Sequence, residues 1–378
     1  MPPLPPPSDD ARASSALLLA RIRGAIASAG WLSFARYMEL ALYTPGLGYY
    51  SGGARKFGAA GDFVTAPEIS PLFGRVLARQ LTEVLDQCGG TILELGAGTG
   101  KLAAQILGEL QQLGRRAPYS ILEVSGELRQ RQQETLEQAG LAGTVTWLDT
   151  LPETFTGVIF SNEVLDALPV HLIHWTEHGP QERGVIWQED QLQWQDQPIA
   201  DALLLKRAVA LDLPPGYVSE ISLAAPALVK ELGRCLQAGM LMFVDYGYGR
   251  SEYYHPQRHM GTLRAHYRHR ALDDPFHLPG LTDLSAHVDF TAVAEAGLEA
   301  GLTLLGYTSQ AHFLINGGIT ALLAETPVEP VARYLPLSTG VQKLLSPVEM
   351  GELFKVMELG KGVSATSGFA AGSLTRLL

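Results

Sequence analysis

Short apolar runs alternate with amphipathic stretches through the middle of this chain. The runs at 91–95, 119–124, 144–148, 157–161 and 239–246 have the length of buried strands, and apolar residues recur at helical spacing in the stretches between them. This alternation predicts an α/β fold, in which helices cover both faces of a parallel sheet. A ligand in such a fold binds at the carboxyl ends of the strands.

Helical spacing also marks both ends of the chain. Residues 14–30 and 31–42 are predicted helices, with Gly30 ending the first, and an amphipathic helix over 71–87 leads into the first strand. The remaining expected elements are helices over 224–237, 287–298, 311–324 and 346–357, a strand over 302–308, and a last antiparallel strand that completes the sheet.

Three segments interrupt this rhythm. Residues 42–70 are rich in glycine, aromatic and turn residues, as in the long irregular loops that close over active sites, and a packed surface loop is the open alternative. Residues 170–213 contain short alternating pieces typical of an inserted antiparallel sheet, and residues 247–290 are rich in polar aromatic and basic residues. The expected organisation is a disordered proline-rich tail over 1–13, a helical and loop cap over 14–75, and a core over 76–378 with insertions at about 170–213 and 247–290.

The turn after the first strand carries the most informative pattern. Gly96, Gly98 and Gly100 let backbone N–H groups approach a ligand closely, and the next helix offers unpaired N–H groups to an anionic group. A dinucleotide fold would place glycine where Lys101 stands. The ExGxGxG pattern that begins at Glu94 is instead typical of S-adenosylmethionine (SAM) methyltransferases.

Acidic residues follow the next two strands. Glu123 lies about where a βαβ unit places an acid on ribose hydroxyls, and Asp149 is a candidate adenine contact. A capping role for Glu123 and a turn role for Asp149 remain open alternatives. The loop before the glycine turn and the end of the fourth strand supply further candidates. The full set of candidate cofactor-binding residues is Asp62, Thr65, Pro67, Glu68, Glu94, Gly96, Ala97, Gly98, Gly100, Glu123, Asp149 and Asn162.

The fourth strand runs into Asn162, Glu163 and Asp166, at the edge where the reactive end of a cofactor would lie. If the segment turns helical after Asn162, the two carboxylates are three residues apart and share a face. They would then suit a cationic substrate. The alternative is a helix N-terminus that carries stabilising acids.

Composition and charge restrict the partners. The chain is 46% hydrophobic and 18% charged, which fits a globular protein with a large core, and its net charge of −11 argues against nucleic acid but not against a basic protein substrate. Cys88 and Cys235 have no CxxC spacing, and strand alternation puts His171 and His174 on opposite faces, so we expect neither disulfide nor metal. No signal, transit peptide or long apolar run is present, which predicts a cytoplasmic protein without membrane insertion.

Seven motifs, in order, give the chain a family resemblance. GDFVTAPEIS, ILELGAGTGKL, EVSGELRQRQ, SNEVLDALPV, FVDYGY, GTLRAH and LSAHVDF resemble the MidA family, which includes a mitochondrial protein arginine methyltransferase needed for respiratory complex I assembly. The resemblance covers residues 34–361. It implies a Rossmann-like class I methyltransferase fold, SAM as cofactor, and arginine side chains of a respiratory dehydrogenase subunit as substrate.

The same resemblance suggests roles for the remaining candidates. A guanidinium stays protonated at neutral pH, so carboxylates must grip and polarise it. We therefore expect Glu163 and Asp166 to bind the acceptor and Asn162 to orient cofactor or acceptor. The expected substrate-side residues are Asp245, Tyr246, His287 and Asp289.

Two other functions remain open from sequence alone. One is a small-molecule O- or N-methyltransferase, and the other is an assembly chaperone that holds SAM without turnover. A nicotinamide oxidoreductase is disfavoured by Lys101 and by Glu94 before the first glycine. The sequence does not decide whether the chain forms a homodimer.

Overall fold

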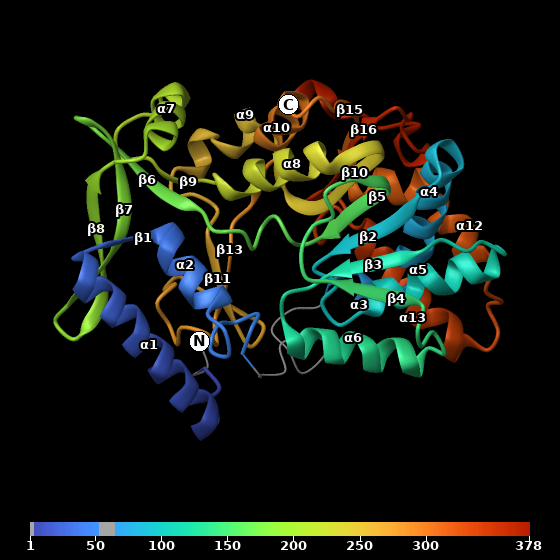
Figure 1. Ribbon diagram of the computed structural model, residues 1–378, viewed down its shortest axis with the longest axis horizontal. Coiled ribbons are helices and arrows are strands. Elements are labelled where there is room, and N and C mark those ends of the chain that lie inside the picture. The colour runs from blue at the N-terminus through green and yellow to red at the C-terminus, as the bar shows by residue number, and fades with distance from the viewer. Residues whose placement is uncertain (1–3, 53–64) are drawn as a thin grey trace. The chain divides into compact units, whose positions relative to one another are not determined.

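The computed structural model describes residues 4–52 and 65–378, and this part of the chain divides into two compact units (Figure 1). The first unit collects described residues from 1–63, 166–225 and 252–287. The second contains the described residues of 64–165, 226–251 and 288–378. Each unit therefore combines segments that are far apart in the sequence.

The second unit is built on the predicted sheet (Figure 1). Its strands lie in the order β15-β16-β10-β5-β2-β3-β4, and β14 pairs with β10. From β4 to β10 all neighbours are parallel, whereas β16 is antiparallel to both β10 and β15. The strands are β2 Thr91–Leu95, β3 Tyr119–Leu122, β4 Val145–Leu148, β5 Phe155–Asn162, β10 Leu236–Tyr248, β14 Val288–Asp289, β15 Thr303–Ser309 and β16 Phe354–Lys361. The mostly parallel sheet with an antiparallel strand near its C-terminal end is confirmed.

Helices pack on both faces of this sheet, as predicted. Leucines and phenylalanines of α4 and α5 share a buried core with Val158 and Phe160 of β5. Leu359 of β16 meets Gly297 of α10 instead, and a Cβ on that glycine would lie 2.6 Å from a Leu359 methyl group. The helices are α3 Ala66–Ile69, α4 Pro71–Cys88, α5 Lys101–Gln112, α6 Gly126–Gln138, α8 Ala224–Cys235, α10 Phe290–Glu299, α11 Gln310–Asn316, α12 Ile319–Ala324 and α13 Val331–Leu345.

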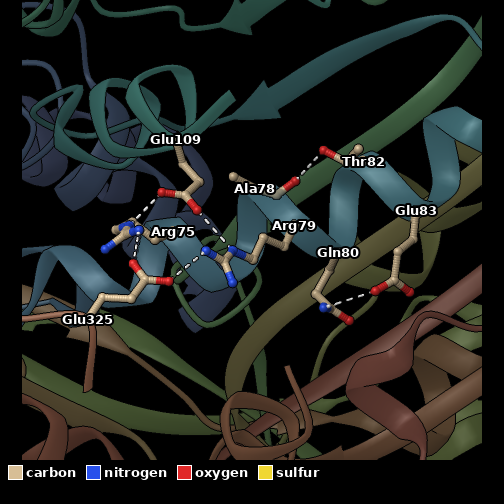
Figure 2. A network of polar contacts seen from close by, with 8 residues as sticks. All are labelled: Arg75, Ala78, Arg79, Gln80, Thr82, Glu83, Glu109 and Glu325. Atoms are coloured by element: carbon tan, nitrogen blue, oxygen red, sulfur yellow. Dashed lines mark hydrogen bonds and ion pairs between the residues drawn. The ribbon is translucent and has the colours of Figure 1, made fainter. Parts of the chain in front are cut away.

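Ion pairs tie α4 to α5 and to the end of α12 (Figure 2). Arg75 Nε and Arg79 Nε donate to the two oxygens of Glu109 at 2.5 and 2.9 Å. Their Nη2 atoms donate to the two oxygens of Glu325 at 2.8 and 3.3 Å. The Glu109 side chain is 1% exposed and that of Glu325 is 50% exposed, so the two carboxylates contribute unequally to stability.

The first unit brings together the N-terminal helices and both predicted insertions. α1 Asp9–Ala29 and α2 Phe34–Tyr43 share a core with the antiparallel sheet of the first insertion and with the small sheet β12-β11-β13 of the second. The remaining elements are β1 Leu32–Ser33, β6 His171–Thr176, β7 Gly179–Gln188, β8 Gln191–Pro198, α7 Ala202–Leu211, β9 Val218–Ile221, α9 Arg250–Tyr253, β11 Arg264–Tyr267, β12 Arg270–Leu272 and β13 Asp283–Ser285. The antiparallel sheet predicted within 170–213 is confirmed.

Two predictions about the chain ends are wrong. The disorder predicted over 1–13 is wrong for residues 9–13, because Ser8 caps a helix that already begins at Asp9. The helix predicted over 346–357 is also wrong. Some of the apolar residues that suggested this helix lie in β16 instead. The helix of this region is α13, which precedes β16. It contains Pro336, and proline is normally unfavourable inside a helix.

Candidate functional site

The glycine turn after β2 has the geometry that its sequence predicts. Gly96, Gly98 and Gly100 have φ values of 61°, 52° and 79°, in the left-handed region that favours glycine. A Cβ on Gly96 would lie 2.9 Å from a Val164 methyl carbon, and one on Gly100 would lie 2.9 Å from the Gln132 backbone. Gly100 has no side chain to cap α5, so the turn leaves backbone N–H groups at the helix start for a ligand.

Glu123, at the end of β3, is fixed beside this turn. Its Oε1 accepts the Ser125 N–H at 2.9 Å, and its Oε2 accepts Gln132 Nε2 at 3.1 Å. Gln132 Nε2 also donates to the Gly98 carbonyl at 3.1 Å. Burial raises the pKa of the Glu123 carboxyl. Gln132 thus connects the two predicted cofactor motifs; sequence reasoning missed it, although it stands in the EVSGELRQRQ motif.

The first acid of the glycine motif lies inside the core. Glu94 is 2% exposed, and its Oε2 accepts the Tyr119 hydroxyl of the neighbouring strand at 2.7 Å. Burial raises the pKa of Glu94 to about 8, so the carboxyl is mostly protonated at neutral pH. Glu94 therefore links β2 to β3, and its direct contact with a cofactor remains a prediction.

The end of the irregular loop docks on the glycine turn. Lys101 Nζ pairs with Glu68 Oε2 at 2.6 Å, and the Thr99 hydroxyl donates to Glu68 Oε1 at 3.1 Å. Gln105 Nε2 donates to the Pro67 carbonyl at 2.8 Å. Thr65 is the N-cap residue of α3 and makes no side-chain capping bond. The structure thus places Thr65 to Glu68 against the turn, whereas Asp62 lies outside the described residues.

The end of β5 places Glu163 in an unusual backbone conformation next to Asn162. Glu163 has a φ of 56°, a value that costs energy for a residue other than glycine and that concentrates at functional sites. Its N–H donates to the Val244 carbonyl at 2.9 Å, and Asn162 Nδ2 donates to Glu163 Oε1 at 2.9 Å. Asn162 Oδ1 is buried without a hydrogen-bond partner in the described part of the chain. This oxygen is placed to accept a hydrogen bond from a ligand.

Asp245 fixes the segment that follows. It is fully buried, and its Oδ2 accepts the N–H groups of Val164 and Leu165 at 3.2 and 2.9 Å. The condition that the segment turns helical after Asn162 is therefore not met, because a carboxylate binds these N–H groups in a bend that Glu163 opens with a positive φ. Asp245 positions the backbone next to Glu163, a role different from the predicted substrate lining. Its neighbour Tyr246 is 8% exposed.

Several known proteins are similar to this chain over most of its length. A family model described as "Putative S-adenosyl-L-methionine-dependent methyltransferase" matches residues 76–308. The chain belongs to this MidA-like methyltransferase family. The mitochondrial protein arginine methyltransferase NDUFAF7 of Rattus norvegicus is 30% identical over 371 residues, covering 88% of this chain and 82% of the relative. Its Drosophila melanogaster homologue is 28% identical, covering 96% and 91%. A Burkholderia thailandensis crystal structure bound to S-adenosyl-homocysteine is 50% identical, with a TM-score of 0.96 and 100% coverage of both chains.

SAM is the cofactor of this methyltransferase, and its residues fit that molecule. Neighbouring atoms leave no space for a side chain at Gly96 or Gly100. No side chain caps α5 either, so the N–H groups at its start would bind an anionic group such as the SAM carboxylate. Glu123 would accept hydrogen bonds from the ribose hydroxyls, as in other βαβ units. The buried and unpartnered Asn162 Oδ1 would accept a hydrogen bond from the amino group of the cofactor.

Asp149, which follows β4, forms an ion pair with Arg129. Arg129 Nη2 binds Asp149 Oδ1 and the Leu148 carbonyl, both at 2.8 Å, while its Nε donates to the Glu123 carbonyl at 2.6 Å. Arg129 therefore holds the ends of β3 and β4 together. The Asp149 side chain is 86% exposed, and its contact with adenine remains a prediction.

The other predicted acceptor residues are divided between the two units. Asp289, in the second unit, caps α10 through the Ala292 N–H at 3.2 Å, and burial raises the pKa of its carboxyl. Asp166 and His287 belong to the first unit. Glu163 and Asp166 would share a helical face only if a helix followed Asn162, and none does.

Residues 4–52 and 65–378 hold neither a three-ligand metal group nor an apolar helix of membrane-spanning length. This part of the methyltransferase contains no group of three or more His, Cys, Asp or Glu side chains that could hold a metal ion. Within the same residues, no helix has the length and apolar character needed to cross a membrane.

The buried Glu94 carboxyl should make stability depend on pH. Its pKa is about 8 in the folded chain against an ordinary 4.5, so the stability that it contributes is complete below pH 4.5 and is lost as pH rises through 8. Urea unfolding of Glu94→Gln should show a pH dependence flatter by on the order of 4 kcal/mol between about pH 5 and about pH 9. An unchanged slope would show that Glu94 is already charged in the folded protein.

Proposed function

We propose that this methyltransferase modifies arginine side chains of a protein substrate, namely a respiratory NADH dehydrogenase subunit of the complex I type, and that the modification serves complex assembly. Full-length relatives named protein arginine methyltransferase support the substrate class. The observation that carries the proposal is Glu163, a carboxylate held at the end of β5 by a strained backbone and a buried aspartate.

This geometry suits the chemical problem that an arginine poses. When bound, SAM supplies an electrophilic methyl group on sulfur. Glu163 binds the guanidinium and orients one nitrogen for attack; the new N–C bond forms as the S–C bond breaks. The methylated nitrogen then loses one proton, which Glu163 accepts and passes to water, and S-adenosyl-homocysteine is released.

Asn162 and Asp245 act on Glu163 rather than on the acceptor. Asn162 Nδ2 donates to Glu163 Oε1 and limits the rotation of the carboxylate. Asp245 binds the next two backbone N–H groups and keeps the bend from relaxing. A carboxylate that is oriented before the acceptor arrives loses less entropy during the reaction.

Transfer of a labelled methyl group tests the proposal. The full chain is incubated with methyl-tritiated SAM and either purified respiratory NADH dehydrogenase or a cell extract, and the protein fraction is then hydrolysed. Label should appear as methylarginine in a dehydrogenase subunit. Label confined to small molecules would indicate a small-molecule methyltransferase, and SAM binding with no transfer to any fraction would indicate an assembly chaperone.

A further inference from the structure

Gln132 takes a position of α6 that would ordinarily hold an apolar side chain. The buried residues of α6 are Gln132 and Leu136, which stand one helical turn apart, and Leu136 belongs to the core of the second unit. Gln132 is itself 0% exposed. A methionine would fill a similar space without the free energy needed to take an amide out of water. A buried glutamine at this place therefore indicates that the hydrogen bonds of its amide matter.

Trp147 of β4 determines which way the Gln132 amide points. Trp147 Nε1 donates to Gln132 Oε1 at 2.8 Å. An indole N–H can only donate, so the amide oxygen has to face it. Gln132 Nε2 is thereby turned toward two acceptors, Glu123 Oε2 and the Gly98 carbonyl, each at 3.1 Å. One buried side chain thus joins β4, the end of β3 and the glycine turn, all within the second unit.

The bond from Gln132 acts on both the charge and the direction of the Glu123 carboxylate. The Ser125 N–H and Gln132 Nε2 bind different oxygens of this carboxylate and so restrict its rotation. Burial raises the pKa of Glu123, and these two hydrogen bonds act against that rise because they stabilise the charged form. A charged carboxylate accepts stronger hydrogen bonds than a neutral carboxyl, which matters for a residue that binds ribose hydroxyls.

Two other ionisable side chains face Glu123. Arg129, also of α6, lowers the pKa of Glu123 through its charge. Its Nε donates to the Glu123 backbone carbonyl rather than to the carboxylate, and its Nη2 binds Asp149. Glu94 of β2 is mostly neutral at neutral pH, because burial, with the charge of Glu123 as a further cause, raises its pKa to about 8. Gln132 differs from both, since it binds the carboxylate directly.

We propose that Gln132 is a positioning residue of the cofactor site, which holds Glu123 as a charged and oriented acceptor for the ribose hydroxyls of SAM. Both ends of the Gln132 amide are bound within the protein, so Gln132 acts through Glu123. Its bond to the Gly98 carbonyl also keeps Glu123 at a fixed spacing from the glycine turn. This inference concerns the cofactor and does not depend on the proposed arginine substrate.

Calorimetric titration of the full chain with S-adenosyl-homocysteine, repeated between about pH 5.5 and about pH 8, tests the inference. Gln132→Met keeps the length of the side chain and removes the amide. At about pH 8 this variant should bind S-adenosyl-homocysteine about tenfold more weakly than wild type. On acidification its affinity should begin to fall at a higher pH than in wild type, because Glu123 then takes up a proton more readily. A purely structural role would lower the affinity by the same factor at every pH.

Two further variants make the result specific to Gln132. Gln133→Met is the matched control, since Gln133 is exposed on the same helix and bonds Glu137, and it should leave affinity within about twofold and the pH profile unchanged. Trp147→Phe removes the N–H that orients the amide, so affinity should fall about threefold with the same direction of pH shift. Trp147→Phe also keeps the test decisive if Gln132→Met does not fold.

Glu123→Gln separates positioning from packing. If Gln132 acts through Glu123, adding Gln132→Met to Glu123→Gln should weaken binding by no more than about twofold. A further tenfold loss in the double variant, or a pH profile of Gln132→Met parallel to that of wild type, would overturn the inference. Unchanged affinity of Glu123→Gln would refute it as well, by removing the ribose contact. Because no acceptor is present in these titrations, failure of the methylarginine assay would leave their result standing.

Discussion

Glu163→Gln should lower the rate of methyl transfer to protein arginine by about 100-fold and leave SAM affinity within about twofold. Glutamine keeps the oxygen that accepts from Asn162 Nδ2, so the bend after β5 should survive the change. What it loses is the negative charge that grips the guanidinium and the base that accepts its proton. Single-turnover transfer from labelled SAM measures the first effect, and calorimetric titration with SAM measures the second.

Glu153→Gln is the matched control for this experiment. It makes the same change of charge in the second unit, at an exposed position before β5, and should leave both quantities unchanged. Full methylation by a normally folded Glu163→Gln variant would remove Glu163 from the mechanism. A tenfold loss of SAM affinity in that variant would assign Glu163 to the cofactor instead.

The cofactor half of the site could be predicted because its signals are local. An apolar strand, three glycines and an amphipathic helix follow one another within residues 91–112. Each of these patterns directly determines the local backbone conformation. Glu123 follows from the length of one βαβ unit. Short-range patterns of this kind need no knowledge of tertiary contacts.

The acceptor half could not be predicted for the opposite reason. The bend at Glu163 depends on Asp245, which stands 81 and 80 residues after the two N–H groups that it binds. Without that contact, the sequence pattern after Asn162 is compatible with a helix start, which is why a shared helical face for Glu163 and Asp166 was considered.

The ion-pair network of α4 carries the largest expected effect on stability (Figure 2). Glu109 accepts from both Arg75 and Arg79 while only 1% of its side chain is exposed. Removing it leaves two partly buried guanidinium groups without their buried partner, and uncompensated charge is far more costly than a missing surface pair. Glu325 binds the same two arginines from a half-exposed position, where water can replace it.

Glu109→Ala should therefore lower the free energy of unfolding by about 3 kcal/mol, and Glu325→Ala by less than about 1 kcal/mol. Urea unfolding at neutral pH, followed by circular dichroism, measures both changes. Each variant removes a glutamate carboxylate that pairs with Arg75 and Arg79. The difference between the two losses of unfolding free energy therefore measures the effect of burying that carboxylate. Equal losses would mean that position in the network matters less than the number of ion pairs. A small loss for Glu109→Ala alone would mean that water reaches Arg75 and Arg79 as soon as the carboxylate is gone.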